Sequence, residues 1–335
     1  MKMTLAAKPL STSDFLTGTE LSRDEMEMLL TTAATIKRDL PAYRGIMAGK
    51  TMAMIFEKPS LRTRVSFEVG FAKLGGYVLF IDHQSSRIGQ RESISDFAKN
   101  LERFTDVLVA RTFSHETILE LADAASVPVI NALSDRFHPC QALADVLTIT
   151  ELFPFRGWNG INVAYVGDGN NVCHSLMLAC ATLGINMTVI APKGYQPCTD
   201  VVRESNALAA ESGASIAVSD NMEAVRDHNV VYTDTWISMG SEAETAERLK
   251  VFAPYQVTMD VMNLAGPKSR FMHCLPAHRG QEVAAEVIDS PRSVVFDQAE
   301  NRMHAQNALV AHLLSEESRA TARSPMWPDV VGAAV

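Results

Sequence analysis

The stretch FEKPSLRTRVSFE, residues 56–68, joins a strand-like sequence to a helix-like one and carries three cationic side chains. The apolar run TMAMIF, residues 51–56, leads into it, and a helical pattern follows from Arg62 to Leu74. A helix start offers unpaired N–H groups and the positive end of the helix dipole, to which arginine adds charge. We interpret this turn as an anion site. The alternative is a solvated loop with an ordinary helix cap at Ser60.

The same strand-then-helix order repeats along the whole chain. Strands are predicted at TMAMIF, YVLFI, DVLVA, VPVINAL, INVAYV, MTVIA, SIAV, NVVYT and RFMHCL. Ser22 and Glu25 predict a capping box at the first clear helix, and Gly75 ends the helix after TMAMIF. Such alternation predicts parallel sheets covered by helices on both faces.

A break in this alternation suggests where one domain ends. The segment PFRGWNG, residues 154–160, fits neither a strand nor a helix and is interpreted as the link between domains. We therefore predict an α/β fold with two domains, residues 1–153 and 154–302. A C-terminal helix over residues 303–320 is expected to pack back onto the first domain.

Bulk composition limits the possible functions. With 335 residues, 47% of them hydrophobic, the chain can form a large core and more than one domain. A net charge of −9 argues against non-specific nucleic-acid binding. The five cysteines form no CxxC pair, which is typical of reduced cytoplasmic thiols. No signal peptide is expected, and no run reaches the roughly 18 apolar residues of a membrane span.

Polar clusters follow six of the predicted strands. They are SLRTR (60–64), Arg111, HPCQ (138–141), GDGNN (167–171), DTWISMG (234–240) and HCLP (273–276). Ligands of parallel sheets bind beyond the carboxyl ends of the strands. Because six solvated loops at six strand ends would be an unusual coincidence, we expect these clusters to line one cleft.

The clusters predict several kinds of contact. Arg62 can clamp phosphate oxygens, and Arg111, at the end of an apolar strand, must face either solvent or a ligand. His138 and Gln141 can each bond a carbonyl or amide group. GDGNN lacks the third glycine of a dinucleotide fingerprint, so NAD binding is not predicted and its asparagines suit a polar amino acid instead.

The acidic and thiol groups leave alternatives open. Asp234 can bind an ammonium group or cap a helix. Cys274 could be a nucleophile or a zinc ligand, but neither a nucleophile–base motif nor a standard ligand spacing is present. Arg302 is a further cation. An isolated arginine near a helix start usually lies on the surface. No metal site and no cofactor are predicted.

Taken in order, SLRTR, HPCQ, GDGNN, DTWISMG and HCLP resemble the ornithine carbamoyltransferase family, part of the wider aspartate/ornithine carbamoyltransferase group, from about Leu16 to Leu314. The resemblance implies a homotrimer with active sites near subunit interfaces, a first domain that binds carbamoyl phosphate and a second that binds L-ornithine. It also implies carbamoyl transfer to give citrulline, in arginine metabolism, without a covalent intermediate.

The resemblance further implies a role for each site residue. The residues implied to bind carbamoyl phosphate are Ser60, Leu61, Arg62, Thr63, Arg111, His138, Gln141 and Arg302. Those implied to hold the amino-acid end of ornithine, or to line the place where the substrates meet, are Asn171, Asp234, Ser238, Met239, Cys274 and Leu275.

Two departures from the family pattern stand in this chain. Leu61 replaces the first threonine of the usual S-T-R-T-R, where a backbone N–H can still act. Arg87 stands where the family usually has Gln or His, in a segment that, in the family, reaches a neighbouring subunit's carbamoyl phosphate. The alternatives to ornithine transfer are a related amine, N-acetylornithine or putrescine, and a non-catalytic ligand-binding homologue.

Overall fold

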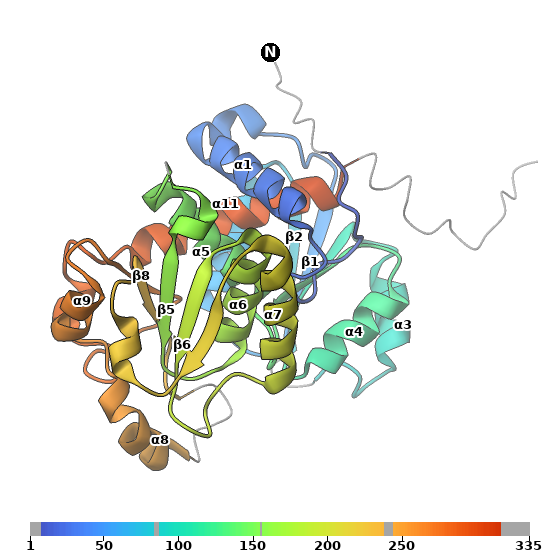
Figure 1. Cartoon of the computed structure of the whole chain (residues 1–335). Coiled ribbons are helices and arrows are strands. Elements are labelled where there is room, and N and C mark those ends of the chain that lie inside the picture. Colours follow the sequence, from blue (N-terminus) through green and yellow to red (C-terminus); the bar gives the residue numbers. More distant parts are fainter. Residues whose placement is uncertain (1–7, 84–86, 155, 238–243, 316–335) are drawn as a thin grey trace, which may run out of the picture.

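The computed structural model describes residues 8–83, 87–154, 156–237 and 244–315, which form two α/β halves (Figure 1). In the described part of the first half, a parallel sheet has the order β2–β1–β3–β4, with strands β1 (Thr51–Phe56), β2 (Tyr77–Asp82), β3 (Val107–Arg111) and β4 (Val129–Leu133). In the second half, a parallel sheet has the order β7–β6–β5–β8–β9, with strands β5 (Asn162–Val166), β6 (Asn186–Ile190), β7 (Ile216–Ser219), β8 (Val230–Thr233) and β9 (Arg270–His273).

Helices connect these strands. They are α1 (Arg23–Arg38), α2 (Leu61–Lys73), α3 (Ile94–Leu101), α4 (His115–Ala124), α5 (Pro139–Leu152), α6 (Asn171–Leu183), α7 (Thr199–Ser212), α8 (Thr245–Phe252), α9 (Met259–Ala265), α10 (Ala285–Ile288) and α11 (Val295–Leu313). The last helix begins at Val295 rather than at the predicted residue 303, and residues 316–320 lie outside the described part of the chain. None of the described helices is long and apolar enough to cross a membrane.

Both faces of each sheet are covered, as predicted. Alternate residues of β1 show this for the first sheet: Met52 and Met54 belong to the large core under α1, α5 and α11, whereas Ala53 and Ile55 pack with α3 and α4. In the second sheet, α6 and α7 lie on one side and α9 on the other (Figure 1). The two-domain α/β prediction is therefore confirmed.

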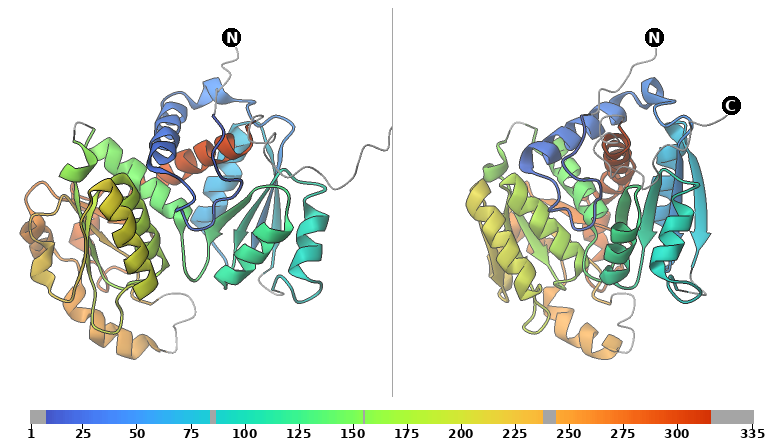
Figure 2. Two further views of the ribbon diagram at one scale, coloured as in Figure 1. Left: turned by 45° about the vertical axis from the view of Figure 1, so that its right-hand side comes forward. Right: turned by 90° about the vertical axis from the view of Figure 1, so that its right-hand side faces the viewer.

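The two halves share one apolar core. Buried side chains of α5, α6 and α11 join the inner faces of both sheets into a single cluster, and α11 packs against α5, α1 and α2. Figure 2 shows α11 returning from the second half to lie beside α1. This packing fixes the carboxyl ends of the two sheets next to each other.

Local sequence signals explain where helix α1 begins and where helix α2 ends. At the start of α1, Ser22 Oγ accepts a hydrogen bond from the Glu25 N–H at 3.3 Å, and Glu25 Oε2 accepts one from the Ser22 N–H at 2.9 Å, which is the predicted capping box. After α2, Gly75 has a φ of +92°, and a Cβ there would lie 2.9 Å from the Gly45 Cα. Only glycine therefore fits this turn without a shift of the backbone.

Candidate active site

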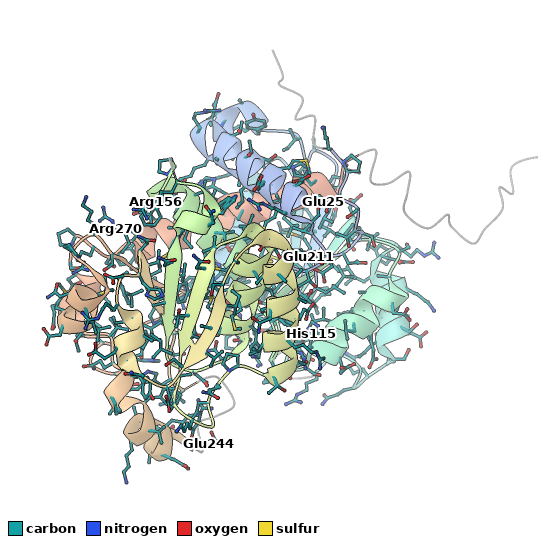
Figure 3. All side chains as sticks on the ribbon, in the orientation of Figure 1. Glu25, His115, Arg156, Glu211, Glu244 and Arg270 are labelled. Atoms are coloured by element: carbon teal, nitrogen blue, oxygen red, sulfur yellow. The ribbon has the colours of Figure 1, made fainter. Side chains whose placement is uncertain are left out.

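A cavity of about 620 Å³ lies at the carboxyl ends of strands from both sheets. Residues from all six predicted clusters line it, with Arg302 of α11. Ser134 also lines the cavity. Its Oγ is hydrogen-bonded to His115 of α4, which is labelled in Figure 3, with a distance of 3.0 Å to Nδ1. The clusters therefore converge on one cleft, as the rule for parallel sheets predicted.

Three guanidinium groups make one side of the cavity positive. Arg62 comes from the first turn of α2, Arg111 from the end of β3 and Arg302 from α11. None of the three forms a salt bridge with a residue in the described part of the chain, and Nε of both Arg111 and Arg302 is buried without a partner there. Burial, reinforced by Arg302 and Arg62, lowers the pKa of Arg111 to about 9. Uncompensated buried charge is costly, so this side of the cavity is suited to an anion.

The start of α2 adds to the same anion site. Ser60 Oγ accepts a hydrogen bond from the Thr63 N–H at 3.3 Å, and Arg302 Nη2 donates to Thr63 Oγ1 at 2.8 Å. The helix thus presents its N-terminus, with the backbone of Leu61 and Arg62, to the cavity. A phosphate group would meet N–H donors, a helix dipole and three cations together.

Next to the arginines lie His138 and Gln141, at the start of α5. Burial, with Arg302 and Arg111 nearby, lowers the pKa of His138 well below its usual value, so the imidazole is neutral at neutral pH. Gln141 donates from Nε2 to Asp145 Oδ1 at 2.8 Å, which leaves its buried Oε1 without a partner among the described residues. The pair can bond a small group that offers both a carbonyl oxygen and an N–H.

The opposite side of the cavity carries a buried carboxylate, Asp234. Its Oδ1 accepts hydrogen bonds from the Thr235 N–H at 2.7 Å and from Cys274 Sγ at 2.9 Å, and its Oδ2 accepts one from Asn170 Nδ2 at 2.8 Å. Asn170 belongs to the predicted asparagine pair of GDGNN, but the sequence analysis gave it no role of its own. The predicted residue Asn171 also lines the cavity, but its side chain donates to the Ser134 carbonyl oxygen at 2.6 Å.

Cys274 is a protonated thiol in this setting. Burial and the neighbouring Asp234 raise its pKa well above the ordinary value, and the thiol donates its hydrogen to that carboxylate. Because the thiolate is the nucleophilic form, this environment argues against covalent catalysis by Cys274. Leu275, which follows it, lines the cavity with a φ of +59°.

Asp234, His273 and Cys274 also offer ligand atoms within 4.8 Å of one another. These are ligand types that zinc prefers. In this chain they are engaged in hydrogen bonds: His273 Nδ1 accepts from the Leu275 N–H at 2.8 Å, and His273 Nε2 lies 3.3 Å from Glu282 Oε1. A metal ion would have to displace these bonds, so the cluster is better described as a hydrogen-bonded wall of the site.

Among the predicted residues that the structure describes, all but Arg87 line the cavity. Ser238 and Met239 lie outside the described residues. Arg87 is exposed, and its guanidinium carbon lies 4.3 Å from the ring centroid of Phe113. Lys58, which sequence analysis missed although it stands in the opening stretch, lines the cavity with its Nζ 4.5 Å from the same ring. Arg87 and the cavity-lining residue Lys58 thus both contact the ring of Phe113.

Two family models match the chain, one for each half. The aspartate/ornithine carbamoyltransferase carbamoyl-P binding domain matches residues 13–151, and the Asp/Orn binding domain of the same family matches residues 159–313. The chain is 51% identical over 301 residues to ornithine carbamoyltransferase of Shewanella oneidensis, covering 90% of this chain and 99% of that protein. It is 48% identical over 313 residues to the Bacillus subtilis ornithine carbamoyltransferase, covering 93% and 97%.

A solved structure agrees with these matches. Ornithine carbamoyltransferase from Pyrococcus furiosus superposes with a TM-score of 0.86 at 48% identity, covering 92% of this chain and 97% of that one. Fold and site together define a two-domain α/β transferase with an anion site facing a carboxylate. The chain belongs to the aspartate/ornithine carbamoyltransferase family.

Proposed function

We propose that this chain transfers the carbamoyl group of carbamoyl phosphate to the δ-amine of L-ornithine, giving L-citrulline and phosphate. The observation that carries the proposal is the opposition of charge across one cavity, with three guanidinium groups that form no salt bridge among the described residues on one side and Asp234 on the other. The relatives named ornithine carbamoyltransferase, at about half identity over most of the chain, support the same activity.

The family also contains enzymes for aspartate, and the cavity favours ornithine. Aspartate would bring a second carboxylate to the side lined by residues 170–278. Among the described lining residues in that range there is no lysine or arginine, while Asp234 supplies a negative charge. A carboxylate there suits the α-ammonium group of ornithine and would repel a second acid.

We assign the predicted roles to the residues that line this cavity and, for Ser238 and Met239, to residues outside the described part of the chain. Residues 60–63, Arg111 and Arg302 hold the phosphate, His138 and Arg111 bond the carbonyl oxygen, and Gln141 accepts from the carbamoyl NH2. On the other side Asp234 with Asn171 holds the amino-acid end, together with Ser238 and Met239, and Cys274 and Leu275 line the meeting point. Residues 1–153 with the returning α11 then bind carbamoyl phosphate, and residues 154–302 bind ornithine.

The reaction follows from this arrangement. The lone pair of the neutral δ-amine attacks the carbamoyl carbon, a C–N bond forms, and the C–O bond to phosphate breaks with its electron pair leaving on phosphate. The amine loses one proton in the same sequence, and overall this proton is taken up by the departing phosphate. Negative charge grows on the carbonyl oxygen and on the leaving phosphate, where Arg111 and Arg302 already stand without reorganisation. Holding both substrates face to face supplies the orientation that the uncatalysed reaction lacks.

Substrate choice and pH dependence test the proposal. We expect kcat/KM for ornithine to exceed that for putrescine, which lacks the carboxylate, by about 10- to 100-fold. The kcat/KM for ornithine should rise about tenfold per pH unit below the amine's pKa of roughly 10, because an ammonium group has no lone pair. Release of phosphate and formation of the carbamoylated product, which is citrulline only for ornithine, would be measured with ornithine, N-acetylornithine, putrescine and aspartate between pH 6 and 9. Comparable turnover of putrescine, or no citrulline at all, would contradict the assignment.

We also propose a cytoplasmic homotrimer. On α2, Leu61, Val65 and Val69 are 74%, 48% and 39% exposed and lie on one helix face at i, i+4 and i+8. Tyr77 and Leu79 are also exposed, on the edge strand β2, but they alternate with Val78 and Phe80, which pack with α2 in the large core. An exposed apolar patch such as that of Leu61, Val65 and Val69 is typical of a subunit interface. Because Leu61 also lines the cavity, a neighbouring chain on this patch would stand next to the carbamoyl phosphate half. The five free cysteines suit a reducing cytoplasm.

Arg87 tests whether the segment that carries it contributes to carbamoyl phosphate binding. We expect Arg87→Gln to raise KM for carbamoyl phosphate several-fold and to flatten its salt dependence, since an exposed charge-assisted bond is screened by salt. KM for ornithine should change little. Kinetics at low and high ionic strength, with sedimentation to check for the trimer, would measure this. Arg103→Gln, at another exposed arginine, is the matched control. An unchanged carbamoyl phosphate KM at both salt concentrations would make Arg87 a surface residue.

A further inference from the structure

We propose that Asp145 is a positioning residue, which fixes the amide of Gln141 for the carbamoyl group and ties it to the strand end that carries Cys274. The proposal rests on the proposed function, because it assigns a purpose to the carbamoyl NH2. Asp145 lies on α5 one turn after Gln141, is fully buried and does not line the cavity. Its Oδ1 accepts hydrogen bonds from Gln141 Nε2 at 2.8 Å and from Gln298 Nε2 of α11 at 2.7 Å.

The orientation of these amides follows from one unambiguous donor. The backbone N–H of His273 can only donate, and it meets Gln298 Oε1 at 2.9 Å. Gln298 must therefore turn its NH2 toward Asp145, whose Oδ1 must accept. Above its raised pKa of about 7, the Asp145 carboxylate has only acceptors, so the amide of Gln141 must also turn its NH2 toward Asp145. A single backbone group at the end of β9 thus determines which end of Gln141 is left for the cavity.

The consequence for the substrate is direct. Gln141 presents Oε1, a buried acceptor without a partner among the described residues, beside the arginines that suit the phosphate. The carbamoyl NH2 of carbamoyl phosphate is a donor and matches it. Without Asp145 the amide could rotate by half a turn and set its own NH2 against that of the substrate, donor against donor. Asp145 therefore acts on the substrate through Gln141.

The burial of Asp145 fits a dedicated role rather than incidental packing. Burial raises its pKa to about 7, although Gln141, Gln298, Tyr232 and Arg302 all act in the opposite direction. Its second oxygen, Oδ2, is buried without a partner among the described residues. An apolar side chain would avoid this cost. The buried carboxyl group therefore lowers the stability of the fold, and its role in orienting two glutamine amides accounts for its presence.

The test compares two ligands that differ only at the group in question. Acetyl phosphate carries a methyl group where carbamoyl phosphate carries NH2. Dissociation constants of both would be measured by calorimetry at pH 8.5 without amine. We expect Asp145→Leu, which fills the site with an apolar side chain and removes the acceptor, to weaken carbamoyl phosphate binding about five- to tenfold, the value of one hydrogen bond. Binding of acetyl phosphate should change less than about twofold.

Three further variants complete the design. Asp145→Asn keeps an acceptor oxygen for both glutamines and should restore carbamoyl phosphate affinity to within about twofold of the original chain. Thr148→Val, one turn further along α5, removes the hydrogen bond from Asn301 Nδ2 at 3.0 Å and does not touch Gln141. It should leave the dissociation constants of both ligands unchanged. If the leucine variant does not fold, Asp145→Ala removes the same acceptor without added volume and carries the same expectation.

The outcomes separate this proposal from the proposed function. Equal weakening of both phosphates, no weakening of either, or an asparagine variant as poor as the leucine one would overturn the positioning role. Citrulline formation by the original chain is a separate measurement. Its absence would reject the proposed function, whereas the two-ligand comparison judges Asp145 in either case.

Discussion

Replacement of Arg111 by alanine should lower kcat by at least about 100-fold, close to 3 kcal/mol of transition-state stabilisation, while the protein melts near its normal temperature. In the proposed complex Arg111 stands where charge develops on the carbamoyl oxygen and phosphate, so its loss should be felt most in the transition state. Its guanidinium contributes little to folding, because burial and the charges of Arg302 and Arg62 already disfavour it and lower its pKa to about 9. Catalysis and stability should therefore separate at this position.

The matched control is Arg44→Ala, at an exposed arginine of the same half of the chain. It should change neither kcat nor the melting temperature. Steady-state kinetics and thermal unfolding of both variants would be compared under one set of conditions. An Arg111 variant that melts normally and turns over at nearly the original rate would remove this residue from the mechanism.

The strands could be predicted from the sequence because of how parallel sheets are covered. With both faces buried, each strand is a short apolar run bounded by polar loops, and all the predicted strands agree with the structure to within two residues. The same geometry explains why the cavity could be anticipated. Parallel strands send their following loops to one edge, so a polar cluster after each strand already indicates a common site.

Tertiary contacts decide what the sequence could not show. The first half of α11 carries buried Gln298, Asn301 and Arg302, a polar pattern that does not indicate a buried helix, and the predicted start was therefore too late. Asp145 lies in the run ALADVLTIT, where a lone acid suggests an exposed position. Its partner Gln298 is 153 positions away in the sequence. A contact between residues so far apart cannot be predicted from a local sequence pattern. Once it is known, it explains why polar residues of α11 are buried.

The choice between Asn170 and Asn171 has a similar cause. Both asparagines begin α6, and the sequence does not reveal which one is the cap. In the structure Asn170 Oδ1 accepts from the N–H groups of Val172 and Cys173, which fixes its Nδ2 on Asp234. Capping of the helix and orientation of the carboxylate are thus one arrangement, and Asp234 cannot turn without disturbing it.

This anchoring makes Asp234 the residue that should matter most for the amine. It is only 7% exposed, and Asn170, Thr235 and Cys274 hold both of its oxygens. A buried, preoriented carboxylate gains most from a cationic partner, because little water competes for either group. The α-ammonium of ornithine is that partner in the proposed complex. Loss of one member of such a pair typically costs about 3 kcal/mol, or roughly 100-fold in binding.

Asp234→Ala should accordingly raise KM for ornithine about 100-fold and leave the dissociation constant of carbamoyl phosphate within about twofold. The sharper readout uses 5-aminopentanoate, which has the same δ-amine and carboxylate as ornithine but no α-ammonium. The original chain should prefer ornithine strongly, and the variant should treat the two amines nearly alike, because the group that distinguishes them has lost its partner. Asp220→Ala, at an exposed carboxylate paired with Lys193, should keep the full preference. A strong preference for ornithine in the Asp234 variant would show that another group binds the α-ammonium.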